Sequence, residues 1–477
     1  PPAPPWFRGA LRKCGRRCEA RGLDSVQTMI RLLLLAASAS AAENGLARLP
    51  PLGWRSWNLY GGNVNQTLIE GIMASMVRRS SRYTVDGVPT SLCDLGFCDV
   101  GLDDNWQACG RHGEGGYTYH DEEGNPLVNS ERFPSMKSMT SYAHSLGLTA
   151  GWYGNNCICS EKKTGDRRFY AGDVRAMREM GFDSWKLDGC GAQTDMQLWS
   201  DLIQATPATT GRSAIMVENC HWGSRRPYEP TATWCPWNFY RTSGDVRATY
   251  GSVIGNLQSV FKFSGRNLSY PGCWAYADML EVGVLASPFS GDKGLTIAET
   301  RSHFAAWAIV SSPLTLSHDP SNLTIMDAIW PVLSNRELLA ISQAYAGYSG
   351  GPFKEAAEGL QLAAADTALA RPGASAAELA VLPPLRVPAW QYLYKPLEWG
   401  GRKAAVLLMN HGKEAAQLTL AFADVPGLGC RACSVRDVWS RKDVGTFNGS
   451  VTLGVGSHDC ALLVLTHVSP HVARAAA

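Results

Sequence analysis

Lys186 and Asp188 stand two residues apart in residues 183–190, DSWKLDGC, a short strand-like run that stops at a glycine. Residues two apart in a β-strand share a face, so both charges would point into one barrel or cleft while Leu187 faces a covering layer. A neighbouring ammonium lowers the pKa of a carboxyl and keeps it ionised. This arrangement suits a catalytic carboxylate at a strand end. On this stretch alone, a buried structural ion pair is the alternative interpretation.

Further acidic residues stand at other predicted strand ends, namely the pair Asp103 and Asp104, then Asp245 and Asp278. Carboxylates accept hydrogen bonds from sugar hydroxyls, and tryptophans, of which the chain has 16, cover the apolar faces of sugars. Glycoside hydrolysis needs two carboxyls, one to attack or to activate water and one to protonate the leaving oxygen. The set therefore indicates sugar chemistry.

A metal site is an alternative use of these carboxylates. His221, His303 and His318 could in principle join the aspartates around a cation. Their spacing resembles no metal-binding pattern, and a lone His after a strand is more often a pocket or core residue. We therefore predict no metal and no cofactor.

Length, charge and the amino-terminal segment limit the function classes. A chain of 477 residues predicts one large and one smaller domain. The formal net charge of +2 gives no sign of binding to nucleic acid or to a membrane surface. Residues 29–42 begin with Met29 and read as a secretory signal peptide, whereas residues 1–28 are interpreted as non-native upstream sequence. The apolar run is shorter than the roughly 20 residues that span a bilayer, so we expect no transmembrane anchor.

Cysteines and sequons point to an oxidising compartment. The chain has 14 cysteines, of which Cys14 and Cys18 precede Met29, and the number remaining predicts several disulfides. N-glycosylation sequons begin at Asn65, Asn267, Asn322 and Asn448. We therefore expect a protein that is secreted or delivered to a lysosome- or vacuole-like lumen.

Apolar segments alternate with helical patterns from Leu52 onward, which favours a parallel sheet. We expect strands at 54–58, 100–106, 149–155, 184–189, 214–220, 239–244, around 270–274 and at 309–317. Helices are expected at 65–77, 135–146, 171–180, 195–205 and 297–308. Eight such strands favour a TIM (β/α)8 barrel over a doubly wound sheet, and no Gly-rich dinucleotide motif follows the first strand. Polar residues end nearly every strand, where barrel active sites lie.

We assign the predicted barrel to residues 49–354. The amino-acid composition of the chain changes after it. Residues 355–385 are Ala-rich and polar and contain Pro383-Pro384, as expected of a linker. Residues 386–468 show short alternating segments separated by Gly, Asn and Asp turns. This pattern predicts a C-terminal antiparallel β-sandwich.

Several motifs occur in a characteristic order. They are LGWRSWN at 52–58, LDDNW at 102–106, ERFP at 131–134, GWY at 151–153, KLDGC at 186–190, RTSGD at 241–245, DML at 278–280 and AWAI at 306–309. Together they closely resemble glycoside hydrolase family 27, which comprises α-galactosidases (melibiases) and α-N-acetylgalactosaminidases. The resemblance covers residues 50–345, and residues 388–467 resemble the C-terminal β-sandwich of that family.

The resemblance implies a role for each matching residue. Asp188 matches the family nucleophile and Asp245 matches its acid/base. Asp103 and Asp104 match the pair that reads the 4- and 6-hydroxyls of galactose. The remaining matches line the pocket: Lys186 and Arg241 near the 3- and 2-hydroxyls, Trp57 and Tyr153 as aromatic walls, and Asp278 as a further polar position.

His221 departs from the family pattern. Family α-galactosidases usually carry Cys-Glu-Trp where this chain reads Cys220-His221-Trp222, and that Glu helps to distinguish galactose from its 2-acetamido relative. Small residues usually make room for an acetamido group, and His is not small. We therefore expect a preference for galactose, with His221 beside the 2-position of the sugar.

Motif positions also suggest disulfides. We expect Cys220 to pair with Cys235, and Cys190 to pair with either Cys157 or Cys159. Another bond is expected among Cys93, Cys98 and Cys109, and Cys430, Cys433 and Cys460 belong to the predicted sandwich, with the connectivity left open.

The resemblance thus implies a retaining exo-hydrolase that releases terminal α-linked galactose from a glycan, with its two carboxyls about 5–5.5 Å apart. We expect Lys186 to keep Asp188 ionised and Asp245 to titrate at higher pH than Asp188. The sequence leaves a homodimer open. The alternatives are an α-N-acetylgalactosaminidase or another specificity of the family, and a non-catalytic carbohydrate-binding protein on the same fold. Retention of both Asp188 and Asp245 argues against the last.

Overall fold

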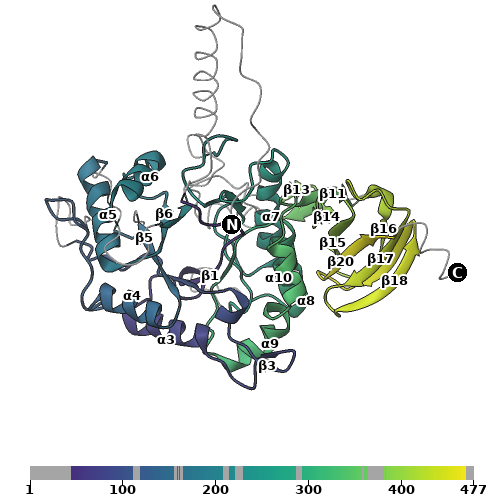
Figure 1. The fold of residues 1–477 in the computed structure, drawn as a ribbon, viewed down its shortest axis with the longest axis horizontal. Coiled ribbons are helices and arrows are strands. Elements are labelled where there is room, and N and C mark those ends of the chain that lie inside the picture. Colours follow the sequence, from purple (N-terminus) through teal and green to yellow (C-terminus); the bar gives the residue numbers. More distant parts are fainter. Residues whose placement is uncertain are drawn as a thin grey trace, which may run out of the picture. The chain divides into compact units, whose positions relative to one another are not determined.

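A sheet of eight parallel strands forms the centre of the first domain in the computed structural model (Figure 1). The order is β10-β1-β4-β5-β6-β7-β8-β9. The strands are β1 (Leu52–Arg55), β4 (Asp99–Gly101), β5 (Thr149–Gly154), β6 (Ser184–Asp188), β7 (Met216–Cys220), β8 (Phe239–Arg241), β9 (Trp274–Tyr276) and β10 (Leu314–Leu316). Leu280, just past β9, donates its N–H to Thr315 O of β10 at 2.8 Å, which bridges the two outer strands. The predicted TIM barrel is confirmed.

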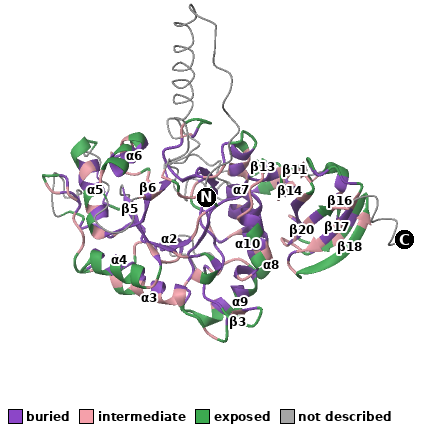
Figure 2. Cartoon of the chain, in the orientation of Figure 1, coloured by how far each residue is buried: buried purple, intermediate pink, exposed green. Residues whose placement is uncertain are grey.

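The structure describes residues 44–110, 119–154, 158–159, 161, 165–207, 214–220, 229–285, 293–356, 359–363, 381 and 383–468. Within them, helices surround the sheet, with their exposed faces turned outward and the strands buried (Figure 2). The helices are α2 (Trp57–Tyr60), α3 (Gln66–Val77), α4 (Met136–Ser145), α5 (Arg167–Met180), α6 (Met196–Ala205), α7 (Tyr250–Ser264), α8 (Ile297–Ile309), α9 (Leu323–Leu333) and α10 (Arg336–Ser342). A short pair, β2 (Thr84–Val85) and β3 (Val88–Pro89), follows α3.

Side-chain caps set where the longer helices begin. An Asn, Ser, Asp or Thr before each of α3 to α10 accepts a backbone N–H of the first turn, as N-cap residues do. The Asp166 cap places the start of α5 at Arg167, four residues before the predicted start. Strand β9 begins at Trp274, where the predicted strand ended, and α7 was not predicted.

The alternation predicted for residues 184–188 is confirmed in β6. Trp185 points outward, and its ring centroid lies 4.9 Å from that of Trp199 on α6. Ser184 and Lys186 point inward, because the Ser184 hydroxyl donates to Asp99 of β4 at 2.9 Å and Lys186 Nζ reaches Asp103 beyond the end of β4. One face of this strand therefore supplies the polar side chains of the barrel interior.

Arg55 of β1 is buried inside the barrel. Its Nη1 lies 2.8 Å from Asp99 Oδ2, and its Nε lies 3.9 Å from Glu218 Oε2 of β7. Gly101 and Gly151 on the neighbouring strands make room for it, since a Cβ at Gly101 would overlap Arg55 Nη1 and one at Gly151 would lie 2.6 Å from it. The absence of two side chains thus accommodates a large buried cation.

The carboxyl-terminal strands form the predicted β-sandwich. One sheet has the order β11-β14-β15-β20-β17-β18, and β16 pairs with β19 in a second sheet. Their bounds are β11 (Gly351–Glu355), β14 (Trp390–Pro396), β15 (Lys403–Met409), β16 (Ala416–Ala421), β17 (Ala432–Asp437), β18 (Lys442–Asn448), β19 (Ser450–Val455) and β20 (Cys460–His467). Val406, Leu420 and Val435 lie in the core shared by the two sheets.

The connection between the domains contains strands of its own. Strand β11 precedes the predicted linker at 355–385 and already pairs with β14 of the sandwich. Within the predicted linker and at its end, β12 (Leu360–Leu362) pairs with β13 (Leu385–Val387). The segment predicted as a linker is therefore bordered by paired strands at both of its ends.

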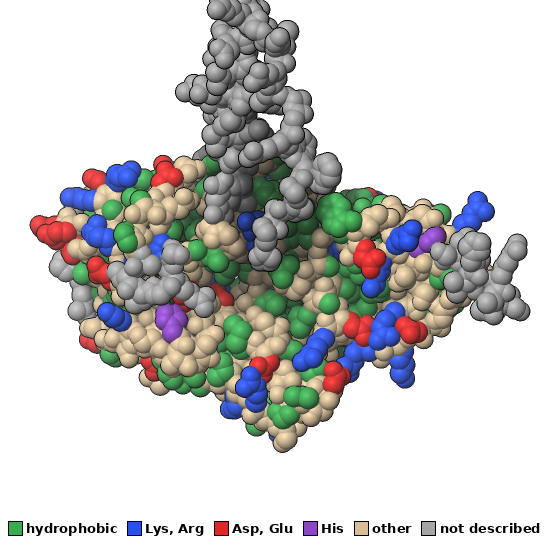
Figure 3. Space-filling model, viewed as in Figure 1, with side chains coloured by type: hydrophobic (Ala, Val, Ile, Leu, Met, Phe, Trp, Pro, Cys, Tyr) green, Lys and Arg blue, Asp and Glu red, His purple; other side chains and the backbone are tan. Residues whose placement is uncertain are grey.

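Buried polar contacts join the sandwich to barrel helices. Lys395 of β14 is fully buried, and its Nζ donates to Ile341 O at 2.6 Å and Ser342 O at 2.9 Å, at the end of α10. Ser302 of α8 donates to His458 O at 2.7 Å. On the face drawn in Figure 3, Lys and Arg side chains lie interspersed with Asp and Glu. Among the described residues, no helix has the length and apolar character needed to cross a membrane.

Candidate active site

Asp188 is the last residue of β6 and lies at the carboxyl end of the barrel. Its Oδ2 accepts a hydrogen bond from the Tyr153 hydroxyl at 3.0 Å, and its Oδ1 accepts one from Gly189 N at 2.6 Å. Both carboxylate oxygens are therefore oriented by donors from β5 and from the loop after β6.

Lys186 pairs with the predicted sugar-binding carboxylate Asp103 and not with Asp188 at close range. Lys186 Nζ lies 2.7 Å from Asp103 Oδ2, both side chains are buried, and the ammonium stands 5.5 Å from the centroid of the Tyr153 ring. Lys186 also interacts electrostatically with Asp188. The lysine therefore lies among three of the predicted site residues.

Asp104 follows Asp103 and is held by backbone donors. Its Oδ2 accepts from Ile158 N at 2.9 Å and its Oδ1 from Asn105 N at 2.8 Å. Burial raises the pKa of Asp104 to about 6, although these donors act to lower it. Ser56, after β1, fixes the neighbouring backbone by accepting from Asp103 N at 3.0 Å.

Arg241, at the end of β8, joins the predicted acid/base to Asp278. Its Nη2 lies 2.9 Å from Asp245 Oδ1 and its Nη1 lies 3.0 Å from Asp278 Oδ1. Asp278 has a backbone φ of 87°, a conformation uncommon outside glycine, and its Oδ2 accepts from Val246 N at 2.7 Å. The Asp245 side chain is 65% exposed whereas that of Arg241 is 1% exposed, so the carboxylate projects from a buried guanidinium.

The pKa values of the two predicted catalytic carboxyls shift against expectation. Burial raises the pKa of Asp188; Lys186 opposes this shift, and the charges of Asp103 and Asp245 add to it. The protein around Asp245 removes part of its hydration, but Arg241 outweighs that effect and holds the pKa of Asp245 below its ordinary value. The expectation that Asp245 titrates at higher pH than Asp188 was therefore wrong for the free protein, because each carboxyl has a different nearest cation.

The remaining predicted pocket residues have different placements. Trp57 begins α2 directly after β1 and packs against a small apolar cluster that includes Phe239, Trp274 and Tyr276. Tyr153 is buried in β5 beside Lys186 and Asp188. His221 lies outside the described residues. The structure thus brings together every predicted polar site residue that it describes.

Glu218 of β7 was missed as a site residue, and Cys220 was predicted only as a disulfide partner. Glu218 and Cys220 are both buried; Arg55 lies 3.9 Å from Glu218, and Arg241 Nη1 lies 3.5 Å from Cys220 Sγ. Burial raises the pKa of Glu218 to about 7, against the charges of Lys186 and Arg55. The i, i+2 alternation that singled out Lys186 and Asp188 applies equally to this pair and could have identified it.

The predicted disulfide between Cys220 and Cys235 was wrong. Cys235 bonds Cys273, and Cys220 is a buried free thiol. The physical reason is topological: Cys220 ends β7, whereas Cys235 and Cys273 precede β8 and β9 and so lie toward the opposite ends of parallel strands.

The structure tests the other predicted disulfides in part. Cys159 bonds Cys109, so it is not the partner of Cys190; Cys190 is itself disulfide-bonded, and the alternative partner Cys157 lies outside the described residues. A bond between Cys93 and Cys98 confirms the one expected near the second barrel strand. In the sandwich, Cys430 bonds Cys433 and Cys460 is free.

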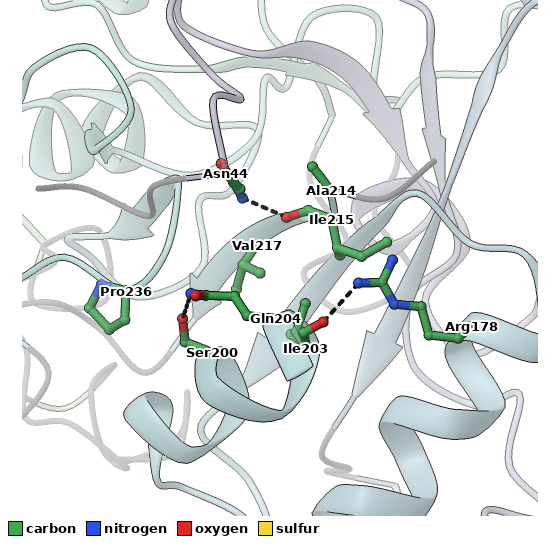
Figure 4. A pocket seen from close by; sticks show the side chains of 9 residues that line it. All are labelled: Asn44, Arg178, Ser200, Ile203, Gln204, Ala214, Ile215, Val217 and Pro236. Carbon is green, nitrogen blue, oxygen red and sulfur yellow. Dashed lines mark hydrogen bonds between the residues drawn. The ribbon is translucent and has the colours of Figure 1, made fainter. Parts of the chain in front are cut away.

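A separate cavity of about 260 Å³ lies at the other end of β7 (Figure 4). Ile215 and Val217, at the start of that strand, line it, and the buried Arg178 of α5 donates to Ile203 O at 2.8 Å along its wall. Asp188 and Cys220 end their strands, so this cavity is distinct from the candidate site. Among the described residues, no group of three or more His, Cys, Asp or Glu has an arrangement that could hold a metal ion.

Comparisons with known proteins agree with this geometry. The family described as Alpha galactosidase A matches residues 49–344, and the Alpha galactosidase C-terminal beta sandwich domain matches residues 388–465. Alpha-galactosidase 3 of Arabidopsis thaliana is 30% identical over 89% of this chain and 83% of its own length. Alpha-galactosidase of Oryza sativa subsp. japonica is 28% identical over 90% of this chain and 88% of its own length.

A solved structure shows the same fold. Alpha-galactosidase I from Mortierella vinacea superimposes with a TM-score of 0.65 at 24% identity, covering 90% of this chain and 100% of its own. The predicted resemblance to glycoside hydrolase family 27 is therefore confirmed. With a family match over most of its barrel, a second match over its sandwich and a 30% identical relative over nearly its whole length, the chain belongs to the alpha-galactosidase A family.

Proposed function

We propose that the chain releases terminal α-linked galactose by a double displacement in which Asp188 is the nucleophile and Asp245 the acid/base. The α-galactosidase activity follows from the family to which the chain belongs and from relatives that bear this name. The assignment of the two residues rests on one observation: the Asp188 carboxylate at the end of β6 and the Asp245 carboxylate just beyond β8, held by Arg241, lie close enough for the charge of Asp245 to act on Asp188. Retention at the anomeric carbon follows from the two displacements.

In the first step, an Asp188 oxygen forms a bond to the anomeric carbon while the glycosidic C–O bond breaks. Tyr153 and Gly189 each donate to one oxygen of Asp188, so the carboxylate enters the reaction with its orientation fixed. The proton of Asp245 passes to the leaving oxygen. Asp245 holds this proton only when its pKa rises, and an aglycone covering its exposed side chain produces that rise by excluding water.

In the second step, Asp245 removes a proton from water, and the resulting hydroxide attacks the anomeric carbon and releases Asp188. Asp188 carries no charge in the glycosyl ester, so Arg241 and Lys186 then act on Asp245 without competition from that carboxylate. The ion pair with Arg241 favours the ionised state that a general base needs.

Asp103, Asp104 and Lys186 form the proposed recognition site for galactose. Two adjacent carboxylates and an ammonium can bind an axial 4-hydroxyl together with neighbouring hydroxyls. A sugar that lacks this arrangement would displace water from these buried groups without replacing its hydrogen bonds, which costs binding energy. Arg241 and Asp278 are proposed to line the other side of the pocket.

Single substitutions test the two catalytic roles. We expect Asp188→Asn to abolish turnover of every α-galactoside. Asp245→Asn should retain the first step on a nitrophenyl α-galactoside, whose leaving group needs little protonation, and should accelerate when azide replaces water as the nucleophile. Proton NMR should show the α-anomer of galactose as the first product; a β-anomer would refute the mechanism.

A substrate panel tests specificity. Nitrophenyl α-galactoside, α-N-acetylgalactosaminide, β-L-arabinopyranoside and α-glucoside are assayed with the wild type and with His221→Glu. We expect the wild type to prefer the α-galactoside. Preference for the acetamido sugar would favour an α-N-acetylgalactosaminidase, and sugar binding without turnover in either protein would favour a carbohydrate-binding protein.

We also propose that the protein acts outside the cytosol, in an extracellular or lysosome- or vacuole-like space. Disulfides at Cys93–Cys98, Cys109–Cys159 and Cys235–Cys273 support an oxidising compartment. Expression in a secreting host should give glycosylated protein whose mass falls on removal of N-glycans. A homodimer remains a prediction that light scattering tests.

A further inference from the structure

A buried histidine outside the proposed catalytic residues is held between two carboxylates. His120 Nδ1 lies 2.7 Å from Glu161 Oε1, and its Nε2 lies 2.9 Å from Asp173 Oδ1. The exposed fractions of these three side chains are 0%, 0% and 2%. Gln193 Nε2 extends the cluster by donating to Asp173 Oδ2 at 2.6 Å. We call His120, Glu161, Asp173 and Gln193 the histidine clamp.

The histidine clamp joins loops that leave three neighbouring strands. His120 belongs to the connection between β4 and α4, Glu161 to that between β5 and α5, and Gln193 to that between β6 and α6. The same strands end at Asp103, Tyr153 and Asp188 in the proposed site. Asp173 adds an anchor in α5. The clamp therefore links described residues of three loops that leave one side of the barrel mouth.

A short path leads from the clamp to the proposed recognition carboxylate. Glu161 Oε2 also accepts from Tyr119 N at 2.6 Å, so the Glu161 carboxylate binds both the Tyr119 backbone N–H and the His120 imidazole. Three residues before Glu161, Ile158 N donates to Asp104 Oδ2 at 2.9 Å. Cys159, which lies between these two residues, bonds Cys109, so the clamp and the disulfide both anchor the segment that supplies this donor.

The positive charge of the His120 imidazole stabilises the histidine clamp. Burial acts to lower the pKa of His120, but Asp173 and Glu161 outweigh it and raise the pKa to about 9. The rings of Tyr119 and Phe169 flank the imidazole, with centroids 4.1 Å and 5.0 Å away. Without a cation between them, the Glu161 and Asp173 carboxylates would face each other in a site screened from water. The protonated imidazole thus binds two loops and a helix together at neutral pH.

A role as a metal site fits this geometry less well, and the nearby disulfide does not replace the clamp. Each ring nitrogen faces a different carboxylate, so the three groups do not converge on one point as metal ligands do. The nearby Cys109–Cys159 disulfide links the first two loops covalently, but it reaches neither α5 nor the loop that carries Gln193.

We propose that His120 is a positioning residue for substrate recognition, which holds the loop after β5 so that Ile158 N–H stays on the Asp104 carboxylate. This inference rests on the proposed function of Asp104 in sugar binding. Its consequence is electrostatic, because the Ile158 donor lowers the pKa of Asp104 against the effect of burial. Loss of the clamp would make Asp104 harder to ionise and would weaken galactose binding near neutral pH.

The test compares wild type, His120→Gln and the milder Glu161→Gln, which keeps an acceptor for Tyr119 N. Galactose affinity is measured by calorimetry from pH 5 to pH 8, and amide exchange at Ile158 is measured at pH 7. We expect wild-type affinity to fall below a midpoint near pH 6 and that midpoint to rise by about one pH unit in both variants. Affinity at pH 6.5 should drop about threefold, and exchange at Ile158 should accelerate about tenfold.

His144→Gln serves as the matched control, because His144 Nε2 lies 2.8 Å from Asp183 Oδ2 at the opposite end of β6. It should change neither quantity. Asp104→Asn separates the two hypotheses: if it leaves affinity unchanged while His120→Gln still accelerates exchange at Ile158, the role of Asp104 fails and the clamp stands. Unchanged exchange and an unchanged midpoint in folded Glu161→Gln would overturn the clamp, as would equal effects in His144→Gln.

Discussion

Arg241 Nη2 lies 2.9 Å from Asp245 Oδ1, so the proposed acid/base of the free protein is an ion-paired carboxylate. The same guanidinium reaches Asp278 with its other terminal nitrogen. The pKa of Asp245 is held below its ordinary value while that of Asp188 is raised. The productive state, with Asp188 ionised and Asp245 protonated, is therefore the minor singly protonated form of the free enzyme.

This order predicts how pH acts on Arg241→Gln. When the acid titrates below the nucleophile, the acidic limb of the kcat/KM profile follows the acid. Loss of the guanidinium raises the pKa of Asp245 and should move that limb upward by roughly one pH unit. The absolute rate should also fall, because Asp278 loses its cation. Hydrolysis of nitrophenyl α-galactoside across pH measures both effects.

Arg266→Gln is the control for that profile. Arg266 forms an exposed ion pair with Glu229 away from the strand ends, so its loss should leave the limb in place. An unmoved limb in Arg241→Gln would show that Arg241 does not set the titration of Asp245.

Glu218 should make stability depend on pH. Burial raises its folded-state pKa to about 7, above the ordinary value near 4.5. A raised pKa contributes stability below pH 4.5 that is lost as pH rises through 7, on the order of 3 kcal/mol. Glu218→Gln removes this loss, so the free energy of unfolding of the variant relative to wild type should increase between pH 4.5 and pH 8. Urea unfolding at several pH values measures it.

An exposed glutamate supplies the comparison for Glu218. Glu414→Gln changes a solvated side chain and should follow the wild-type curve at every pH. A constant difference between Glu218→Gln and wild type would contradict the raised pKa.

The sequence was sufficient to predict the barrel, the sandwich and most polar residues of the site, because strand alternation and motif order carry that information locally. The inward placement of Lys186 on one face of its strand follows from such alternation. What failed depended on distances between strands that are far apart in sequence. The pairing of Lys186 with Asp103, and that of Cys235 with Cys273, are set by the barrel register and not by spacing along the chain.

The same limit applies to the histidine clamp. His120, Glu161 and Asp173 are separated by 41 and 12 residues, and no local pattern in the sequence connects them. Only the folding of adjacent β–α loops onto one edge of the barrel brings them together. Arg55 is a related case, since its buried position depends on two glycines in other strands.

The revised disulfide assignment predicts a specific peptide map. Non-reducing digestion should yield peptides linking Cys235 to Cys273 and Cys109 to Cys159. Cys220 and Cys460 should react with an alkylating reagent only after unfolding, because both thiols are buried and burial raises the pKa of each. A linked peptide containing Cys220 would restore the original prediction.

Lys395 should be important for the association of barrel and sandwich. Its buried Nζ donates to Ile341 O and Ser342 O, two of the last carbonyls of α10, and Ile341 O also accepts from Ala344 N at 3.3 Å. Lys395→Met keeps most of the apolar stem but removes the buried Nζ donor from both carbonyls, so we expect a loss of about 2–4 kcal/mol in the free energy of unfolding. Lys354→Met, which removes an exposed pair with Asp424, should cost less than about 1 kcal/mol. Thermal and urea unfolding of the two variants compare these effects directly, and equal losses would show that the Lys395 contacts do not stabilise the domain interface.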